Sequence, residues 1–116
     1  MNEVELLAVV EKKITLFNEK VKEDSKFAEI IGTSDRTVSI SISDGNNYIC
    51  ELKNGILSPI SKSDAPVTSD ISLESDFETI GSILNNEMSP MKAYVKQKLS
   101  VNASFRDLML LRQLLS

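Results

Sequence analysis

The sequence contains no histidine among its 116 residues, which removes the side chain most often used as a general base in enzymes. The same absence removes the commonest metal ligand and the usual partner of serine and cysteine nucleophiles. The remaining serines and carboxylates form no phosphate-binding glycine loop, nucleophile elbow or metal-ligand spacing. The sequence therefore predicts a protein that is not an enzyme and that requires no cofactor or metal ion.

Cysteine and long apolar runs are also nearly missing. The one cysteine, Cys50, cannot form an internal disulfide, and alone it cannot build a thiolate metal site. No segment approaches the roughly 20 apolar residues that a bilayer span needs. The apolar stretch Leu6 to Val10 follows Glu3 and Glu5 instead of the basic segment of a signal peptide. We therefore expect a soluble, cytoplasmic protein in which Cys50 is a buried thiol.

Positive charge is in deficit, because 13 lysines and arginines face 17 acidic residues and give a net charge of -4. A nucleic-acid-binding surface must neutralise phosphates, so we expect no nucleic acid partner. The sign of the charge reverses after Pro90, where Asp107 is the one acidic residue against five basic ones. This segment could face the anionic headgroups of a membrane or the phosphate of a coenzyme A ester, although a solvated rim is the ordinary explanation.

Apolar residues in the first 32 positions recur at helical spacing. A stripe that repeats every three or four residues predicts a long helix on Val4, Leu7, Val10, Ile14, Phe17 and Val21. A shorter helix follows it and should end at Gly32. The spacing then changes, because Val38, Ile40 and Ile42 alternate with small polar residues, which predicts a strand with one buried and one wet face.

The remaining segments predict further strands and helices. A second strand at 48–53 leads through the hairpin signal Asn54-Gly55 to a third strand, Ile56 to Ile60, and a polar connection follows. A fourth strand at 67–73 leads into a helix for which Ser75 and Glu78 form a capping box. A helix opened by Ser89-Pro90 and a fifth strand at 98–101 come next. These elements predict one α+β domain over residues 1–116, with helices layered on a mostly antiparallel sheet.

The last helix, capped by Ser104 and Asp107, carries apolar residues over more than half of its circumference. These residues are Phe105, Leu108, Met109, Leu110, Leu111, Leu114 and Leu115. A helix with one buried stripe does not need so much apolar surface. The excess is therefore buried in an ordinary core, contacts a second copy of the chain or another partner, or lines a ligand cavity. The pattern alone leaves all three explanations open.

Several short strings follow one another in a characteristic order and spacing, although none is specific alone. In chain order they are Val38 to Ser43, Lys53-Asn-Gly55, the strand at 67–73 running into Glu74-Ser-Asp-Phe77, Ser89-Pro90, Ala93-Tyr94 and Lys98-Leu-Ser-Val101. Over nearly the whole chain, this order resembles the sterol carrier protein type-2 domain, a family of non-specific lipid-transfer proteins. The chain departs from the family at Gln97 and at Asn102-Ala103, where glycines usually stand, so the turns there should differ in shape.

The resemblance implies a five-stranded sheet covered on one face by helices, with an apolar tunnel between the layers. Such a tunnel accepts a fatty acid, an acyl coenzyme A ester or another lipid, and it would explain the apolar last helix. By position, the residues implied to line it are Phe77, Ile80, Leu84, Met88, Met91, Leu99, Val101, Phe105, Leu108, Met109 and Leu111. Each of them could instead be part of an ordinary core.

The sequence and the resemblance together predict a non-catalytic carrier of an apolar lipid. Its partners would be the lipid itself and, transiently, an anionic membrane surface or a lipid-using enzyme. The first alternative is an interaction or homodimerisation module that keeps the fold without binding a ligand. The second is a carboxylate-dependent enzyme in which Asp70 and Asp76 meet, although a wet strand face and a helix start explain these two residues better.

Overall fold

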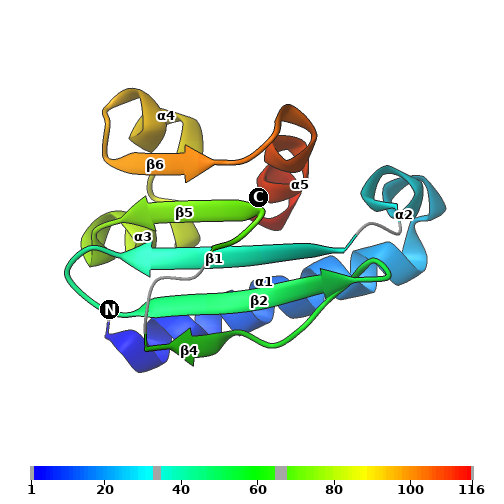
Figure 1. The fold of residues 1–116 in the computed structure, drawn as a ribbon, viewed down its shortest axis with the longest axis horizontal. Coiled ribbons are helices and arrows are strands. Elements are labelled where there is room, and N and C mark those ends of the chain that lie inside the picture. The colour runs from blue at the N-terminus through cyan, green and yellow to red at the C-terminus, as the bar shows by residue number, and fades with distance from the viewer. Residues whose placement is uncertain (1, 33–34, 65–67, 116) are drawn as a thin grey trace.

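The computed structural model describes residues 2–32, 35–64 and 68–115, whose helices and strands are drawn in Figure 1. Two helices precede the first strand, and the other three helices follow the fifth and sixth strands. The elements are α1 (Glu3–Glu23), α2 (Ser25–Ile31), β1 (Arg36–Ile42), β2 (Asn47–Lys53), β3 (Ile56–Leu57), β4 (Ser61–Ser63), β5 (Ile71–Ser75), α3 (Phe77–Leu84), α4 (Pro90–Val95), β6 (Leu99–Asn102) and α5 (Phe105–Leu115).

The described strands form one sheet in the order β3-β2-β1-β5-β6, with β4 beside β2. β1 and β5 are parallel, whereas the other pairs in this sheet are antiparallel. The expected α+β class with a mostly antiparallel sheet is therefore confirmed, although the parallel pair makes the sheet mixed. Five strands follow one another across the sheet, as expected, and β4 is an additional short strand. Its polar segment Ser61–Ser63 has no apolar alternation and becomes a strand only through its backbone pairing with β2.

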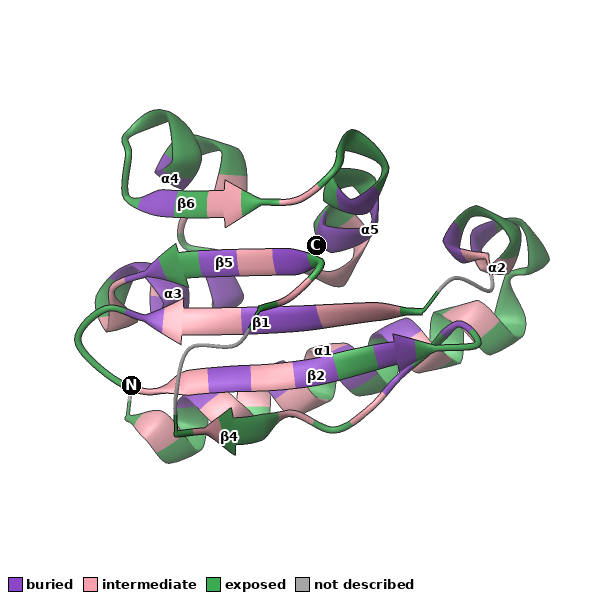
Figure 2. Ribbon diagram, viewed as in Figure 1, coloured by how far each residue is buried: buried purple, intermediate pink, exposed green. Residues whose placement is uncertain are grey.

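One face of the sheet is covered by helices, whereas no helix of the described residues covers the central strands on the opposite face. In Figure 1, α1 and α3 lie behind the sheet, and no helix crosses in front of β1, β2 or β5. Val38 and Ile42 of β1 are buried, as Figure 2 shows along the strand, whereas Ser41 between them is only half-buried. Ser41 pairs with the exposed Glu74 of β5 on the face opposite the helices. The predicted alternation along β1 holds only in part: Ile40 is half-buried, and Ser39 is buried because its Oγ hydrogen-bonds the Oγ of Ser69 at 2.7 Å.

α1 packs an apolar stripe against the rest of the molecule. Its buried residues are Leu6, Val10, Ile14 and Phe17. The stripe expected from the sequence was out of phase in the first turn, because Leu6 is buried while Val4 is 77% exposed. Leu6 and Leu7 stand four and three residues before Val10, so helical spacing alone cannot choose between them. No helix in the described part of the chain is both long enough and apolar enough to span a membrane.

Asn54 and Gly55 form the tight turn between β2 and β3, as the sequence predicts. Their φ angles of 53° and 79° both lie in the left-handed region, as a type I′ hairpin turn requires. The third strand is shorter than expected, because only Ile56–Leu57 pairs with β2. Pro59 has no N–H to continue the ladder, and β3 ends before it.

The start of α3 differs by one residue from the expected capping box at Ser75. The strand expected at 67–73 is β5 at Ile71–Ser75, with Val67 outside the described residues. Ser75 is buried in β5, and its hydroxyl donates to the carbonyl oxygen of Lys98. Asp76 is the N-cap instead, because its Oδ1 accepts a hydrogen bond from the backbone N–H of Thr79 at 2.7 Å.

Asp70 and Asp76 lie at opposite ends of β5 and do not meet. Asp70 Oδ2 accepts the N–H of Thr37 at 2.9 Å, whereas the backbone hydrogen bond from Thr79 lowers the pKa of the Asp76 carboxyl. A strand rises about 3.3 Å per residue, so the two carboxylates are separated by roughly 20 Å. The carboxylate pair that an enzyme of this type would need is therefore not formed by these residues.

α4 ends in a left-handed turn at Gln97, the position where the family resemblance leads us to expect glycine. The φ angle of Gln97 is 60°. Its N–H donates to the carbonyl of Tyr94 at 3.0 Å, and the N–H of Lys98 donates to the carbonyl of Ala93 at 2.9 Å. These two bonds are those of a Schellman motif. The chain therefore makes this turn with a side chain that the left-handed conformation disfavours.

Replacing Gln97 with glycine should stabilise the protein. Glycine avoids the Cβ penalty of the left-handed conformation, about 1–2 kcal/mol. The greater freedom of glycine in the unfolded chain offsets part of this gain, so the free energy of unfolding should rise by about 0.5–1 kcal/mol. Urea denaturation followed by circular dichroism measures the change.

The control is Asn86→Gly at the corresponding turn after α3, where φ is 61°. Asparagine tolerates this conformation better than glutamine, so the control variant should gain less stability. A urea midpoint that falls in Gln97→Gly would show that Gln97 is not strained.

Candidate functional site

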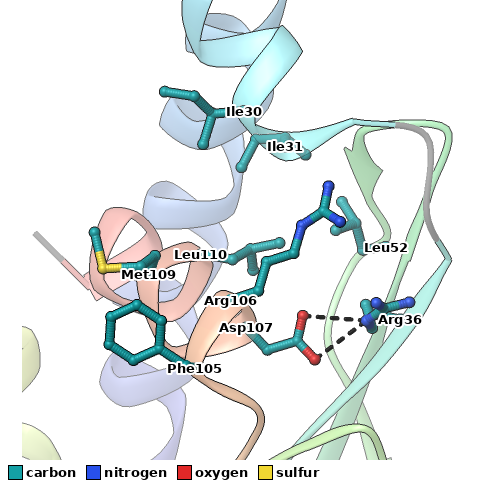
Figure 3. A pocket seen from close by; sticks show the side chains of 9 residues that line it. All are labelled: Ile30, Ile31, Arg36, Leu52, Phe105, Arg106, Asp107, Met109 and Leu110. Atoms are coloured by element: carbon teal, nitrogen blue, oxygen red, sulfur yellow. Dashed lines mark hydrogen bonds and ion pairs between the residues drawn. The ribbon is translucent and has the colours of Figure 1, made fainter.

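A cavity of about 330 Å³ lies between α2, α5 and the neighbouring ends of β1 and β2 (Figure 3). Its lining residues are Ile30, Ile31, Arg36, Leu52, Phe105, Arg106, Asp107, Met109 and Leu110. Most of the wall is apolar, and its charged groups are two arginines and one aspartate. The volume lies at the lower end of the range typical of small-molecule sites, roughly 300–1,000 Å³.

α5 supplies five of the nine lining residues. The helix begins after Ser104, whose Oγ accepts a hydrogen bond from the backbone N–H of Asp107 at 3.2 Å, as the predicted cap requires. Side chains four residues apart lie on the same side of a helix. The α5 wall of the cavity therefore consists mainly of Phe105 with Met109 and Arg106 with Leu110.

α2 forms the opposite wall and is held by its first turn. Asp24 Oδ1 accepts hydrogen bonds from the N–H groups of Lys26 and Phe27, each at 3.1 Å. The Phe27 ring then packs edge-on against the Phe17 ring of α1, with 5.4 Å between centroids. This anchor orients the last turn of α2 toward α5. Ile31 is buried, whereas Ile30 is 65% exposed and stands at the rim.

An ion pair between Arg36 and Asp107 joins β1 to the first turn of α5. Arg36 Nε lies 3.1 Å from Asp107 Oδ1 and 3.2 Å from Oδ2, while Arg36 Nη1 donates to the carbonyl oxygen of Asp35 at 2.8 Å. The side chains of Arg36 and Asp107 are 29% and 9% exposed. The pair lies at the cavity wall, as Figure 3 shows, and fixes the position of α5.

The eleven residues expected to line a tunnel lie in three different settings. Phe105 and Met109 line the cavity between α2 and α5. Ile80, Leu84 and Leu99 surround a separate void of only about 20 Å³ between α3 and the sheet. Such a void has room for about one water molecule, so α3 packs closely on the sheet in this structure.

The other six residues line none of the cavities found in the described part of the chain. Leu111 is buried in the core. Phe77, Met88 and Val101 are partly buried and pack against that core. Met91 and Leu108 are 71% and 39% exposed. The structure therefore brings only part of the expected set to one site, and ligand binding by these residues stays a prediction.

Several cavity residues were not expected from the sequence. Ile30, Ile31, Leu52 and Leu110 look like ordinary core positions, because nothing in a local pattern separates a core contact from a cavity wall. Arg36 and Asp107 are 71 residues apart, beyond any local spacing rule. One signal was present: Asp107 is the single acidic residue in a basic segment, which suits it to a specific cationic partner.

Comparisons with known proteins define the class. The profile of the SCP-2 sterol transfer family matches residues 14–116, so the chain belongs to this family. No curated protein matches the chain significantly in sequence.

Solved structures share its fold. A Thermus thermophilus protein described as possibly a sterol carrier protein superposes with a TM-score of 0.62 at 12% identity, covering 93% of this chain and 82% of its own. Sterol carrier protein 2 from Aedes aegypti, solved in complex with palmitate, has a TM-score of 0.61 at 14% identity, covering 96% of this chain and 94% of its own. The sec-alkylsulfatase Pisa1 from Pseudomonas sp. matches 69% of this chain over 13% of its own length, with a TM-score of 0.56 at 16% identity. At these identities the likeness shows the fold alone.

Arg36→Met should destabilise the protein, because it leaves the Asp107 carboxylate buried without its partner. We expect a loss of about 2 kcal/mol, less than for a fully buried pair since Arg36 is 29% exposed. The double variant Arg36→Met/Asp107→Leu should regain much of this stability, because no unpaired charge remains buried. Urea denaturation of both single variants and the double variant gives the coupling energy. Strictly additive losses would contradict the role of this pair.

Proposed function

We propose that the protein binds and carries one apolar lipid chain, such as that of a fatty acid or an acyl coenzyme A ester, in the cavity between α2 and α5. The observation that carries this proposal is the apolar character of the cavity between α2, α5 and the ends of β1 and β2. Membership of the SCP-2 sterol transfer family supports lipid as the class of ligand. The palmitate complex of the Aedes aegypti protein supports a single acyl chain as one cargo that this fold accepts.

The shape of the cavity suits an apolar chain that enters from the surface. Its inner wall contains Leu52, which is 1% exposed, and Leu110, which is 8% exposed. Its rim contains Phe105, Met109 and Ile30, which are 80%, 43% and 65% exposed. A bound chain would cover these apolar side chains, and each methylene that leaves water contributes roughly 0.8 kcal/mol.

A second hollow of about 160 Å³ lies between α1, α2 and the end of α5 and is a poorer candidate. It is half the size of the first cavity, and its wall includes Lys13, Lys20 and Gln113. Lys20 Nζ hydrogen-bonds Gln113 Oε1 at 3.4 Å and lies 4.6 Å from the centre of the Phe27 ring. These contacts stabilise the packing of the helices and leave less apolar wall for a ligand.

The proposed role requires no catalysis. The chain has no histidine, and the one carboxylate in the cavity wall, Asp107, is paired with Arg36. Burial also raises the pKa of the Cys50 thiol to about 11, which makes it a poor nucleophile at neutral pH. We propose that the protein works in the cytoplasm and exchanges its cargo with an anionic membrane surface or a lipid-using enzyme, in contact with the apolar rim.

Fatty acid binding should strengthen steeply with chain length. Four additional methylenes contribute up to about 3 kcal/mol to binding. In displacement of a fluorescent fatty acid from the delipidated protein, the inhibition constant of palmitate should therefore be at least about tenfold lower than that of laurate. Equal affinity for the two acids would contradict burial of the chain in a cavity.

Met109 and Leu108 provide a matched pair of variants for locating the site. They are neighbours in α5 and are similarly exposed, at 43% and 39%, but only Met109 lines the cavity. Met109→Asp places a charge in the cavity wall and should lower palmitate affinity at least about tenfold, whereas Leu108→Asp should change it less than about twofold. Circular dichroism confirms that both variants fold. The reverse result would place the lipid on the other side of α5.

The exposed apolar side chains favour one alternative, a module that uses α4 and α5 to contact a second copy of the chain. Besides Phe105, Met91 and Val95 of α4 are 71% and 70% exposed. Large exposed apolar side chains mark interaction surfaces when they are contiguous. Light scattering of the lipid-free protein tests this alternative: a dimer that binds no palmitate would favour it over the carrier.

A further inference from the structure

Two guanidinium groups line the cavity, and only one of them is neutralised within the described residues. Arg36 donates from Nε to both carboxylate oxygens of Asp107 and from Nη1 to the carbonyl of Asp35. Its charge is therefore cancelled by Asp107, and its Nε–H and one Nη1–H are engaged in hydrogen bonds. The cavity wall holds two positive charges and one negative charge, so it has a net charge of +1.

Arg106 is the source of this excess charge. In the parts of the chain that the structure describes, no carboxylate pairs with its guanidinium and no acceptor receives a hydrogen bond from it. Its side chain crosses the cavity from α5 toward Leu52, and Phe105 and Met109 lie on the other side (Figure 3). One of its terminal nitrogens, Nη2, lies 3.6 Å from the position that a Cβ on Gly32 would take. The guanidinium therefore stands beside the end of α2, among apolar side chains.

We propose that Arg106 binds the anionic end group of the ligand, so that the site selects single-chain lipids with a terminal carboxylate or a similar anion over neutral lipids such as sterols. This inference rests on the proposed function, because it assumes that the cavity holds an apolar chain. The guanidinium offers five N–H donors in a planar fork that matches a carboxylate in a bidentate geometry.

Arg106 is an exposed residue, and its guanidinium has buried apolar side chains on one side. Ile31 and Leu52 are both buried and lie on the guanidinium side of the cavity, as Figure 3 shows. Apolar neighbours reduce the screening of a charge pair by water. The acyl chain would extend from the guanidinium toward Phe105 and Met109, where the rim is apolar. A neutral headgroup at the same place would gain only ordinary hydrogen bonds.

The test compares two ligands of equal chain length, laurate and dodecanol, which differ in the charge of the end group. Calorimetric titration of the delipidated full chain gives the affinity for each. Arg106→Gln removes the charge, Arg106→Lys keeps the charge without the bidentate fork, and Arg112→Gln removes a charge from an exposed α5 residue outside the cavity wall. Arg112→Gln is the matched control.

Wild type should bind laurate at least about tenfold more tightly than dodecanol. Arg106→Gln should weaken laurate binding about 10- to 100-fold and change dodecanol binding less than about twofold. Arg106→Lys should fall between wild type and Arg106→Gln, and Arg112→Gln should leave both affinities within about twofold of wild type. This pattern separates recognition of an anion from a purely structural role of Arg106 at the end of α2.

Two results would overturn the headgroup assignment and leave the carrier function intact. In one, Arg106→Gln does not change the ratio of the laurate and dodecanol affinities. In the other, a folded Arg106→Gln variant loses both ligands equally, so that Arg106 only shapes the cavity. Failure of wild type to bind either ligand would overturn the carrier function, and the headgroup assignment with it.

Discussion

The ion pair between Arg36 and Asp107 is the interaction on which the site depends, because it fixes the first turn of α5 against the sheet. The apolar contacts of Leu110 and Leu111 also hold this helix, but hydrophobic burial has no direction and does not set which side chains face the cavity. An arginine that donates to both oxygens of one buried carboxylate does impose a position. The pair therefore contributes more to the geometry of the site than to stability, consistent with the desolvation that burial of two charges requires.

Packing between helices and sheet is uneven, and this unevenness creates the cavity. α3 lies close on the sheet and leaves a void of about 20 Å³, whereas about 330 Å³ remains where α2 and α5 meet the ends of β1 and β2. The reason is the path of the chain: Asp24 turns α2 away from α1, and Gly32 ends it after only two turns. α2 and α5 lie at this end of the sheet, and their side chains do not fill the space between the two helices and the ends of β1 and β2. The site is thus at the margin of the two layers, not in their middle.

Features that depend on a few neighbouring residues could be predicted from the sequence, such as the Asn54-Gly55 turn and the Ser104 cap. Errors of one residue arose where adjacent residues satisfy the same local rule, as Ser75 and Asp76 do for a helix cap, and tertiary contacts decide between them. The cavity could not be predicted, because residues between 30 and 52 form it together with residues between 105 and 110, which are far apart in the sequence. Phe105 and Met109, which belong to the apolar surface of α5 and to the expected set, nevertheless line the cavity.

Because α5 supplies five of the nine lining residues, the cavity exists only while this helix is docked. A ligand that binds the docked form alone stabilises it by mass action, so the free energy of releasing α5 rises with occupancy. Under the proposed function, a bound lipid would therefore make local opening of α5 less frequent without a change of fold. Under the same proposal, the side of α5 that faces away from the cavity would then be held more firmly in the presence of ligand than in its absence.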